Sequence, residues 1–275
     1  MMARTSNTAR TSNTARASIT ARRSITGGRR LLETIATLAA LVVAWDLYTR
    51  VFDVPGFLLP APAAVGAALL EAAKGPLWSH LAATSGLLVS GYAAGVASGL
   101  ACGLLLAKSP RLERWLSGPL LFLQTAPKIA LAPLFGIWFG LGIASKLALI
   151  VSLVFFPVLV ATLVGIRSVD RRLHDLALIL RLSPWQRFRR IECPAALPDI
   201  FVGLRVGAVQ AVVGAVLAEW MAGRQGLGYL MTFATATYKT PLLFAAVIVT
   251  ALLGIAVYQG VEALERRVLA WRDQP

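Results

Sequence analysis

The stretch RLSPWQRFRRIECPAALP, residues 181–198, interrupts an otherwise apolar chain. Seven arginines lie in residues 167–190, whereas residues 146–166 and 200–222 on either side are long apolar runs. An arginine at the centre of a bilayer costs ~2.5–3.5 kcal/mol, so seven of them cannot enter one. The sequence therefore predicts two membrane-spanning helices joined by a charged loop, residues 167–199.

The composition of the whole chain agrees with a membrane protein. The 275 residues are 57% hydrophobic and only 15% charged, and the apolar residues fall in long blocks. This favours a polytopic membrane protein over a soluble domain. The net charge of +14 would also suit nucleic-acid binding. However, basic residues gather on the cytoplasmic side of membrane proteins as well, so we expect no nucleic-acid partner.

The positions of the basic residues predict the orientation. Of the 27 Lys and Arg residues, 20 lie in four segments: residues 1–30, 108–114, 167–190 and 266–272. Only five lie in the segments that alternate with these four, and the remaining two, Lys128 and Arg205, fall within apolar runs. Because positive charge marks the cytoplasmic side, this bias predicts that both termini and the charged loop are cytoplasmic.

Six apolar runs are long enough to cross a membrane, which predicts an all-α polytopic fold of about six transmembrane helices. The expected spans are residues 31–50, 81–107, 116–143, 146–166, 200–222 and 241–263. The third contains Pro119, Pro127 and Pro133. Non-helical backbone at membrane depth survives only against protein or a water-filled cavity, so we expect this span to line the interior.

Four segments organise the chain. Residues 1–30 repeat a basic hexamer and contain no acid, which predicts a disordered tail. Residues 31–77 hold the first span and a proline-rich external connector, although the uncharged part of that span would also suit a signal peptide. We expect the transmembrane core in residues 78–264 and a cytoplasmic tail in residues 265–275.

A glycine stripe in the second span predicts close helix packing. Gly91, Gly95, Gly99 and Gly103 follow one another at intervals of four residues. They therefore lie on one face of a helix and let a second helix approach closely.

The charged loop contains the signature of a short helix. Ser183, Pro184 and Gln186 have the types and spacing of an N-cap, a first-turn proline and a capping-box glutamine. We expect this helix to end before Pro194, because a proline ring disfavours helical backbone at the preceding residue.

The same short helix carries an apolar edge. Trp185, Phe188 and Ile191 share one face, with Arg189 and its neighbours around them. Aromatic side chains ringed by arginine are typical of interface hot spots, which predicts a docking surface. The alternative is that these side chains fold back onto the membrane surface.

Charged residues within spans are candidates for the translocation pathway. Lys128 and Glu219 lie in apolar runs, where charges are costly and usually functional. An amine beside broken helix ends would suit an anionic substrate, and Pro133 breaks the same span. The alternative is that Lys128 extends its amine to the membrane surface, or pairs with an acid such as Glu219 to hold the helices together.

The sequence contains no catalytic constellation. It has no G-x-x-x-x-G-K-[ST] motif, so it binds no nucleotide through a P-loop. Neither His80 with His174 nor Cys102 with Cys193 has metal-ligand spacing. We therefore expect no enzyme activity, metal or cofactor on this chain, and an energy source that is either another subunit or an ion gradient.

The charged loop resembles the EAA loop of membrane subunits of bacterial ABC importers. That motif reads approximately E-A-A, three residues, G, nine residues, then I-x-L-P. Here Asp175-Leu176-Ala177 stands at E-A-A, Arg181 at the glycine, and Ile191 to Pro194 at the last part. The resemblance implies that Ser183–Arg190 docks into a cleft of an ATPase subunit. Arg181 in place of glycine implies either a strained backbone or a different angle between two helices.

The resemblance extends over about residues 55–272. The stretches TAPKIALAPLFGIWFGLGIASK, AVLAEWMAGRQGLGYLM and ERRVLAWR are similar to the nitrate, sulfonate, taurine and bicarbonate branch of these permeases. The resemblance implies a type I importer permease of the bacterial inner membrane. Its implied partners are a second copy of the chain, two ABC ATP-binding subunits that bind ATP, and an external substrate-binding protein.

Three interpretations of the function follow. The first is import of a small anionic organic solute, with a pyrimidine or vitamin precursor as the alternative cargo of the same class. The second is an ion-driven secondary transporter, which would need an internal repeat that the spans do not show. The third is a scaffold, for which changes in the charged loop would leave uptake intact.

Overall fold

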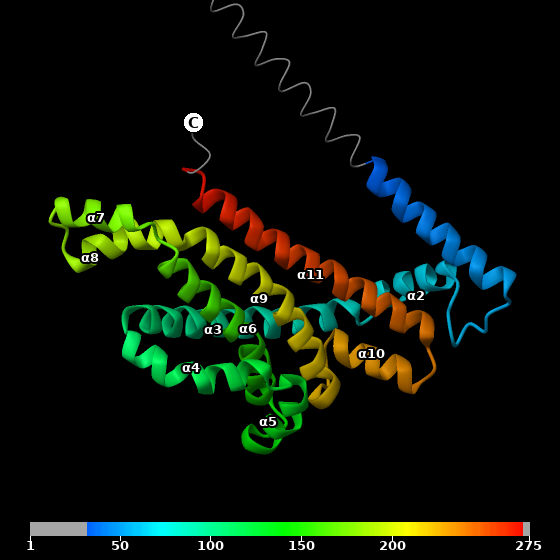
Figure 1. Ribbon diagram of the computed structural model, residues 1–275. Helices are drawn as coiled ribbons and strands as arrows, with labels where there is room; N and C mark the ends of the chain where they lie inside the picture. Colours follow the sequence, from blue (N-terminus) through cyan, green and yellow to red (C-terminus); the bar gives the residue numbers. More distant parts are fainter. Residues whose placement is uncertain (1–31, 272–275) are drawn as a thin grey trace, which may run out of the picture. The chain divides into compact units, whose positions relative to one another are not determined.

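The computed structural model describes residues 32–271, which form helices joined by short connections (Figure 1). The chain separates into two compact units, residues 1–65 and 66–275. The first unit contains the helix Leu32–Val51, which is long and apolar enough to span a membrane. The predicted disordered tail, residues 1–30, lies outside the described residues.

The helices after the first are numbered as in Figure 1, and the described residues contain no strand. They are α2 (Pro62–Lys74), α3 (Leu77–Lys108), α4 (Pro110–Thr125), η1 (Lys128–Leu131), α5 (Ala132–Phe139), α6 (Ile143–Arg167), α7 (Arg171–Ile179), α8 (Pro184–Arg187), η2 (Phe188–Glu192), α9 (Cys193–Ala222), α10 (Leu227–Ala236) and α11 (Thr240–Val268).

The number of membrane spans agrees with the sequence. Within residues 32–271, five helices are long and apolar enough to cross a membrane, and a sixth span results if one bent pair is counted together. That pair is Pro110–Thr125 with Lys128–Phe139, bent by 86°. It is the predicted third span, and its bend lies at Pro127, between α4 and η1. Pro119, by contrast, lies inside the helix α4.

The glycine stripe of α3 packs against α6, as predicted. A Cβ atom on Gly91 would lie 2.6 Å from the side chain of Ile150, and one on Gly95 would lie 2.6 Å from that of Val154. Gly99 and Gly103 meet α6 in the same way. Close backbone approach therefore builds the α3–α6 seam.

Helix α9 completes the core of the second unit. A buried cluster joins α3, α6 and α9 through Leu88, Ile150, Val154, Val158, Ala211 and Ala215. Helix α11 lies beside α9 (Figure 1), and Arg205 Nη1 of α9 lies 2.9 Å from Glu265 Oε2 of α11. This ion pair supplies a partner for one of the two cations that the sequence places within apolar runs.

Candidate docking loop and membrane cavities

The charged loop folds into two short helical arms. Helix α7 begins at Asp170, whose side chain accepts a hydrogen bond from the Arg172 amide at 2.9 Å. Helix α8 follows after a tight turn, and both arms project from the same end of the second unit (Figure 1).

Arg181 closes α7 in the left-handed conformation that usually requires glycine. Its φ angle is +49°. The Leu182 amide donates to the Ala177 carbonyl and the Arg181 amide to the Leu178 carbonyl, each at 3.0 Å. These two bonds define a Schellman C-cap, with Arg181 at the position that favours glycine. Of the two possibilities for Arg181, the structure has the strained backbone.

The capping box at the start of α8 is confirmed. Ser183 Oγ accepts from the Gln186 amide at 3.3 Å, and Gln186 Oε1 accepts from the Ser183 amide at 2.9 Å. Two amides that a helix start leaves without partners are thereby satisfied, which stabilises the arm locally.

The predicted helix end before Pro194 is wrong. The helix that begins at Pro184 continues through a π-helical turn, Phe188–Glu192, into α9 and reaches Met221. The Cys193 amide bonds to the Phe188 carbonyl, five residues back. Pro194 has no amide hydrogen to donate within a helix. The wider π-helical turn shifts the backbone hydrogen bonds just before it, so the helix continues through this position. The second arm of the charged loop and the fifth span are therefore one continuous helix that contains a π-helical turn.

The apolar edge of the arm is exposed at its tip. Trp185 is 64% exposed, and its ring centroid lies 5.8 Å from that of Phe188. Phe188 is half-buried, and Lys108 Nζ, at the end of α3, lies 4.4 Å from its ring centroid. Beside this edge, α7 exposes Leu178 and Ile179.

The residues expected to dock differ in exposure. Those at the surface are Asp175, Arg181, Ser183, Pro184, Trp185 and Arg189. Phe188 and Pro194 are half-buried, and Ala177 is 2% exposed. Ala177 is therefore part of the packing inside the loop, while the six exposed side chains form its outer surface.

Glu192 connects the two arms, a role that the sequence analysis missed. It is 8% exposed, and its Oε1 atom lies 2.8 Å from Arg187 Nε and 3.9 Å from His174 Nδ1. The sequence did contain a sign of this role, namely an acid in a segment with seven arginines. A buried carboxylate needs a cationic partner, and such a segment supplies one.

Lys128 faces a cavity between the bent span, α6 and α9. The cavity is about 550 Å³, and its polar lining consists of Gln124, Lys128, Asp199 and Gln210. Lys128 Nζ donates to the Gln124 carbonyl at 2.9 Å and lies 4.8 Å from the ring centroid of Phe156. We call this the Lys128 cavity.

Pro133 lines a second cavity of about 400 Å³, which also contains Ser145, Lys146 and Met221. We call it the Lys146 cavity. Leu149 lines this cavity and Leu153 lines the Lys128 cavity. The two leucines belong to one apolar cluster with Ala218, against which Phe135 packs. They are one helical turn apart on α6, and we call this pair of leucines the wall between the cavities.

Glu219 lines neither cavity and instead anchors the start of α10. Its carboxylate accepts from Thr84 Oγ1 at 2.8 and 3.0 Å and from the Gly228 amide at 2.8 Å. Thr84 Oγ1 in turn accepts from the Leu227 amide at 2.7 Å. Within the described chain, these hydrogen bonds replace the Lys128–Glu219 pair that was considered from the sequence.

The glycines after span five make room for this carboxylate. A Cβ atom on Gly226 would lie 2.1 Å from the Glu219 carboxyl carbon, and its φ angle is +114°. The Gly226 amide also donates to His80 Nδ1 at 3.0 Å. Helix α10 thus begins on side chains supplied by α3 and α9.

Clusters of metal ligands are absent from the described residues: no three His, Cys, Asp or Glu side chains come together as a metal site would require. What this part of the chain presents instead is an exposed apolar and basic surface on the charged loop, and two cavities among the long helices.

Comparison with known proteins identifies the class. Residues 95–270 match the family described as binding-protein-dependent transport system inner membrane component. The riboflavin transport system permease protein RibX of Chloroflexus aurantiacus is 38% identical over 236 residues, 86% of this chain and 88% of the relative.

Two further relatives cover as much of the chain. The formylaminopyrimidine transport permease protein ThiX of Halalkalibacterium halodurans is 34% identical over 88% of this chain and 97% of its own. The taurine transport system permease protein TauC of Escherichia coli is 32% identical over 90% and 92%. With its helical fold of five or six spans, the chain belongs to the binding-protein-dependent transport family, as a type I importer permease of the ABC transporters.

Proposed function

We propose that two copies of this chain form the translocation pathway of an ATP-driven importer in a bacterial inner membrane. Two copies of a separate ATP-binding subunit dock on the charged loops from the cytoplasm and hydrolyse ATP. An external binding protein delivers a small anionic organic solute, such as a sulfonate or taurine. This chain binds no cofactor, and both of its termini face the cytoplasm.

The observation that carries the docking assignment is the surface of the two arms. Trp185, Leu178 and Ile179 are 64–78% exposed, and the exposed arginines Arg181 and Arg189 lie beside them in the loop. Large apolar side chains surrounded by arginine are what a protein partner buries at a hot spot. The capping box and the Schellman turn hold both arms in shape before a partner binds, which lowers the entropic cost of docking.

The test uses a C-terminal tag and gentle extraction from the native membrane. We expect a P-loop ATPase to co-purify with the natural chain and to be lost with the double variant Trp185→Ala/Phe188→Ala. Trp78→Ala is the matched control, because Trp78 is 63% exposed at the start of α3, outside the loop. An ATPase retained by the double variant would contradict the docking assignment. A chain that comes out alone and still transports would indicate an ion-driven carrier.

The two lysines support an anionic substrate. Lys128 and Lys146 place one amine in each cavity, on either side of the Leu149–Leu153 wall. A cation in a largely apolar cavity attracts anions strongly, because the low dielectric weakens screening. We expect Lys128→Gln to reduce uptake of an anionic substrate, whereas Lys128→Arg retains most of it.

A second candidate substrate is an aromatic heterocycle. Two relatives are named for riboflavin and formylaminopyrimidine transport. The Lys128 cavity also contains the ring of Phe156 and the amides of Gln124 and Gln210, which suit stacking and hydrogen bonding to a heterocycle.

A ligand panel on the cognate external binding protein distinguishes the two substrate classes. The panel contains taurine, an alkanesulfonate, nitrate, formylaminopyrimidine and riboflavin. An increase in melting temperature with a sulfonate or taurine is the expected result, because ligand binding stabilises the folded state. A response to a heterocycle alone would transfer the assignment to the second candidate.

A further inference from the structure

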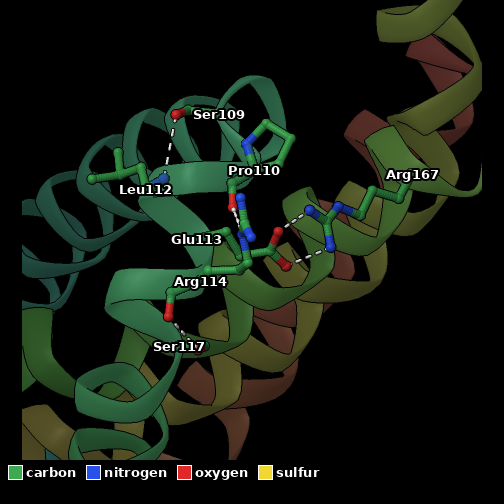
Figure 2. A network of polar contacts seen from close by, with 7 residues as sticks. All are labelled: Ser109, Pro110, Leu112, Glu113, Arg114, Ser117 and Arg167. Atoms are coloured by element: carbon green, nitrogen blue, oxygen red, sulfur yellow. Dashed lines mark hydrogen bonds and ion pairs between the residues drawn. The ribbon is translucent and has the colours of Figure 1, made fainter.

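An ion pair joins the base of the charged loop to the bent span. Figure 2 shows the guanidinium of Arg167, the last residue of α6, facing both carboxylate oxygens of Glu113 in the first turn of α4. The two contacts are parallel, the bidentate arrangement that gives arginine–carboxylate pairs directional strength. The residues it connects are 54 positions apart in the chain.

The Glu113–Arg167 pair attaches α4, a helix with few other contacts, to α6. Helix α4 has no buried residue. Its other polar contacts in Figure 2 are local: Ser109 Oγ accepts from the Leu112 amide at 3.3 Å, Arg114 Nε donates to the Pro110 carbonyl at 3.3 Å, and Ser117 Oγ donates to the Arg114 carbonyl at 3.1 Å. Among the described residues, the Glu113–Arg167 pair supplies the hydrogen bonds that α4 side chains make to another long helix. The start of α4 is therefore joined to α3 through Ser109 and held to the end of α6 by Arg167.

Arg167 itself belongs to a rigid base. Ser168 Oγ, the next residue, lies 2.9 Å from Asp199 Oδ2, across the two ends of the charged loop. A Cβ atom on Gly165 would lie 2.9 Å from the Ala196 carbonyl oxygen, so α6 and α9 are in backbone contact there. A rotation of the loop therefore moves Arg167 with it.

The far end of α4 reaches the Lys128 cavity. Gln124 lies eleven residues after Glu113, about 16 Å along the helix, and lines the cavity next to Lys128. One helix thus carries a contact with the loop base at its start and part of the cavity wall at its end.

We propose that the Glu113–Arg167 pair transmits movement of the docked loop to the bent span. Through α4, it repositions the wall of the Lys128 cavity that carries Gln124. Glu113 and Arg167 are positioning residues, because neither lines the cavity nor belongs to the docking surface. The second route from the loop to the cavity is α9, which is covalently continuous with the arm and needs no ion pair. This inference rests on the proposed function, because an ATPase subunit must move the loop.

The test measures movement along the α4 route and along the α9 route separately, in the complete complex with its ATPase. In a background with Cys102 and Cys193 replaced by alanine, one reporter cysteine is placed at Gln124 on α4 or at Val202 on α9. Both positions line the Lys128 cavity. The probe is a membrane-impermeant maleimide, and labelling rates are compared without nucleotide and after trapping with MgATP and vanadate.

We expect trapping to change both labelling rates by about fivefold or more, a typical allosteric coupling. With Glu113→Gln or Arg167→Gln, the change at position 124 should disappear and the change at position 202 should remain. The charge exchange Glu113→Arg/Arg167→Glu should restore the response at position 124. The matched control Arg266→Gln removes an ion pair on α11, 3.0 Å long and remote from α4, and should alter neither response.

The outcomes separate the two hypotheses. An unchanged response at position 124 in Glu113→Gln would overturn the transmission role and leave the proposed function intact. Loss at both positions would overturn it as well, because the pair would then support the assembly as a whole. Absence of any nucleotide response in the natural chain, with no ATPase bound, would overturn the proposed function and this inference together.

Discussion

A single arginine determines how the two arms of the charged loop meet. Arg181 adopts φ +49°, a conformation that costs a residue with a Cβ atom about 1–2 kcal/mol relative to its usual regions. Helix α10 ends in the same way at Tyr238, which has φ +55°. The Tyr238 amide donates to the Thr235 carbonyl, and the Lys239 amide donates to the Ala234 carbonyl. Hydrogen bonds to orphan carbonyls offset the strain at both helix ends.

Arg181→Gly should therefore stabilise the chain. Glycine adopts the left-handed conformation without steric cost, so we expect a gain of about 1 kcal/mol and an apparent melting temperature about 2–4 °C higher. The control is Arg181→Ala, which removes the same charge and keeps the strain. Equal melting temperatures for the two variants in detergent would show that backbone strain is not the cause.

Glu219 accepts buried hydrogen bonds whose loss should destabilise the chain. Glu219→Ala leaves Thr84 and the Gly228 amide without their acceptor, at about 1–3 kcal/mol for each buried group. Glu219→Gln keeps one acceptor oxygen and should cost less. As a control, Glu262→Ala breaks an exposed ion pair and should change the melting temperature little. A Glu219→Ala variant as stable as that control would rule out the anchoring role.

A contact between two residues could be predicted from the sequence when the two residues lie close together in the chain. The capping box of Ser183 and Gln186 was predictable because both partners lie within one turn of the same helix. The bonds from Glu219 to Thr84 were not, since 135 residues separate them and no local pattern records which helices become neighbours. The glycines Gly226 and Gly228 marked the place without revealing what they accommodate.

At the scale of elements, the α3–α6 seam depends on the absence of side chains. A Cβ atom on Gly95 would meet Val154 at 2.6 Å, whereas one on Gly86 of the same helix would meet nothing within 4 Å. We expect Gly95→Ala to destabilise by about 1–3 kcal/mol through overpacking, and Gly86→Ala to be neutral or slightly stabilising. If Gly95→Ala and Gly86→Ala lost the same stability, the loss would not come from the α3–α6 seam. Thermal unfolding in the same detergent makes the comparison.

Helix boundaries were less predictable than helix faces. The four-residue glycine period identified the packing face of α3, because that period is a property of every helix. The end of α8 was misjudged at Pro194, since a π-helical turn depends on bonds that proline statistics do not include. Helix α10 was missed for a related reason: its first turn is stabilised by His80 and Thr84 of another helix, while its own sequence resembles a turn.

At the scale of the whole molecule, the two cavities and the wall between them suggest where passage is blocked. Leu149 and Leu153 face opposite cavities from one helix and pack with Ala218 and Phe135. The wall is apolar, so a bare anion crossing it would lose its hydration without gaining a partner. Lys146 lines one cavity and Lys128 the other, so under the proposed function an anion would have an amine beside it on each side of the wall.

Thinning this wall should produce a leak that needs no ATP. We expect Leu149→Ala/Leu153→Ala to pass nitrate across liposomes that contain the complex, because a gap lined by alanine admits water to both cavities. Leu88→Ala is the control: Leu88 is equally buried, at 1% exposed, but lies in the α3–α6–α9 core. Nitrate entry, followed with an anion-quenched fluorophore, should rise several-fold in the double variant alone. A tight double variant would mean that the block lies elsewhere, whereas a leak in Leu88→Ala would trace it to general loosening of the bundle.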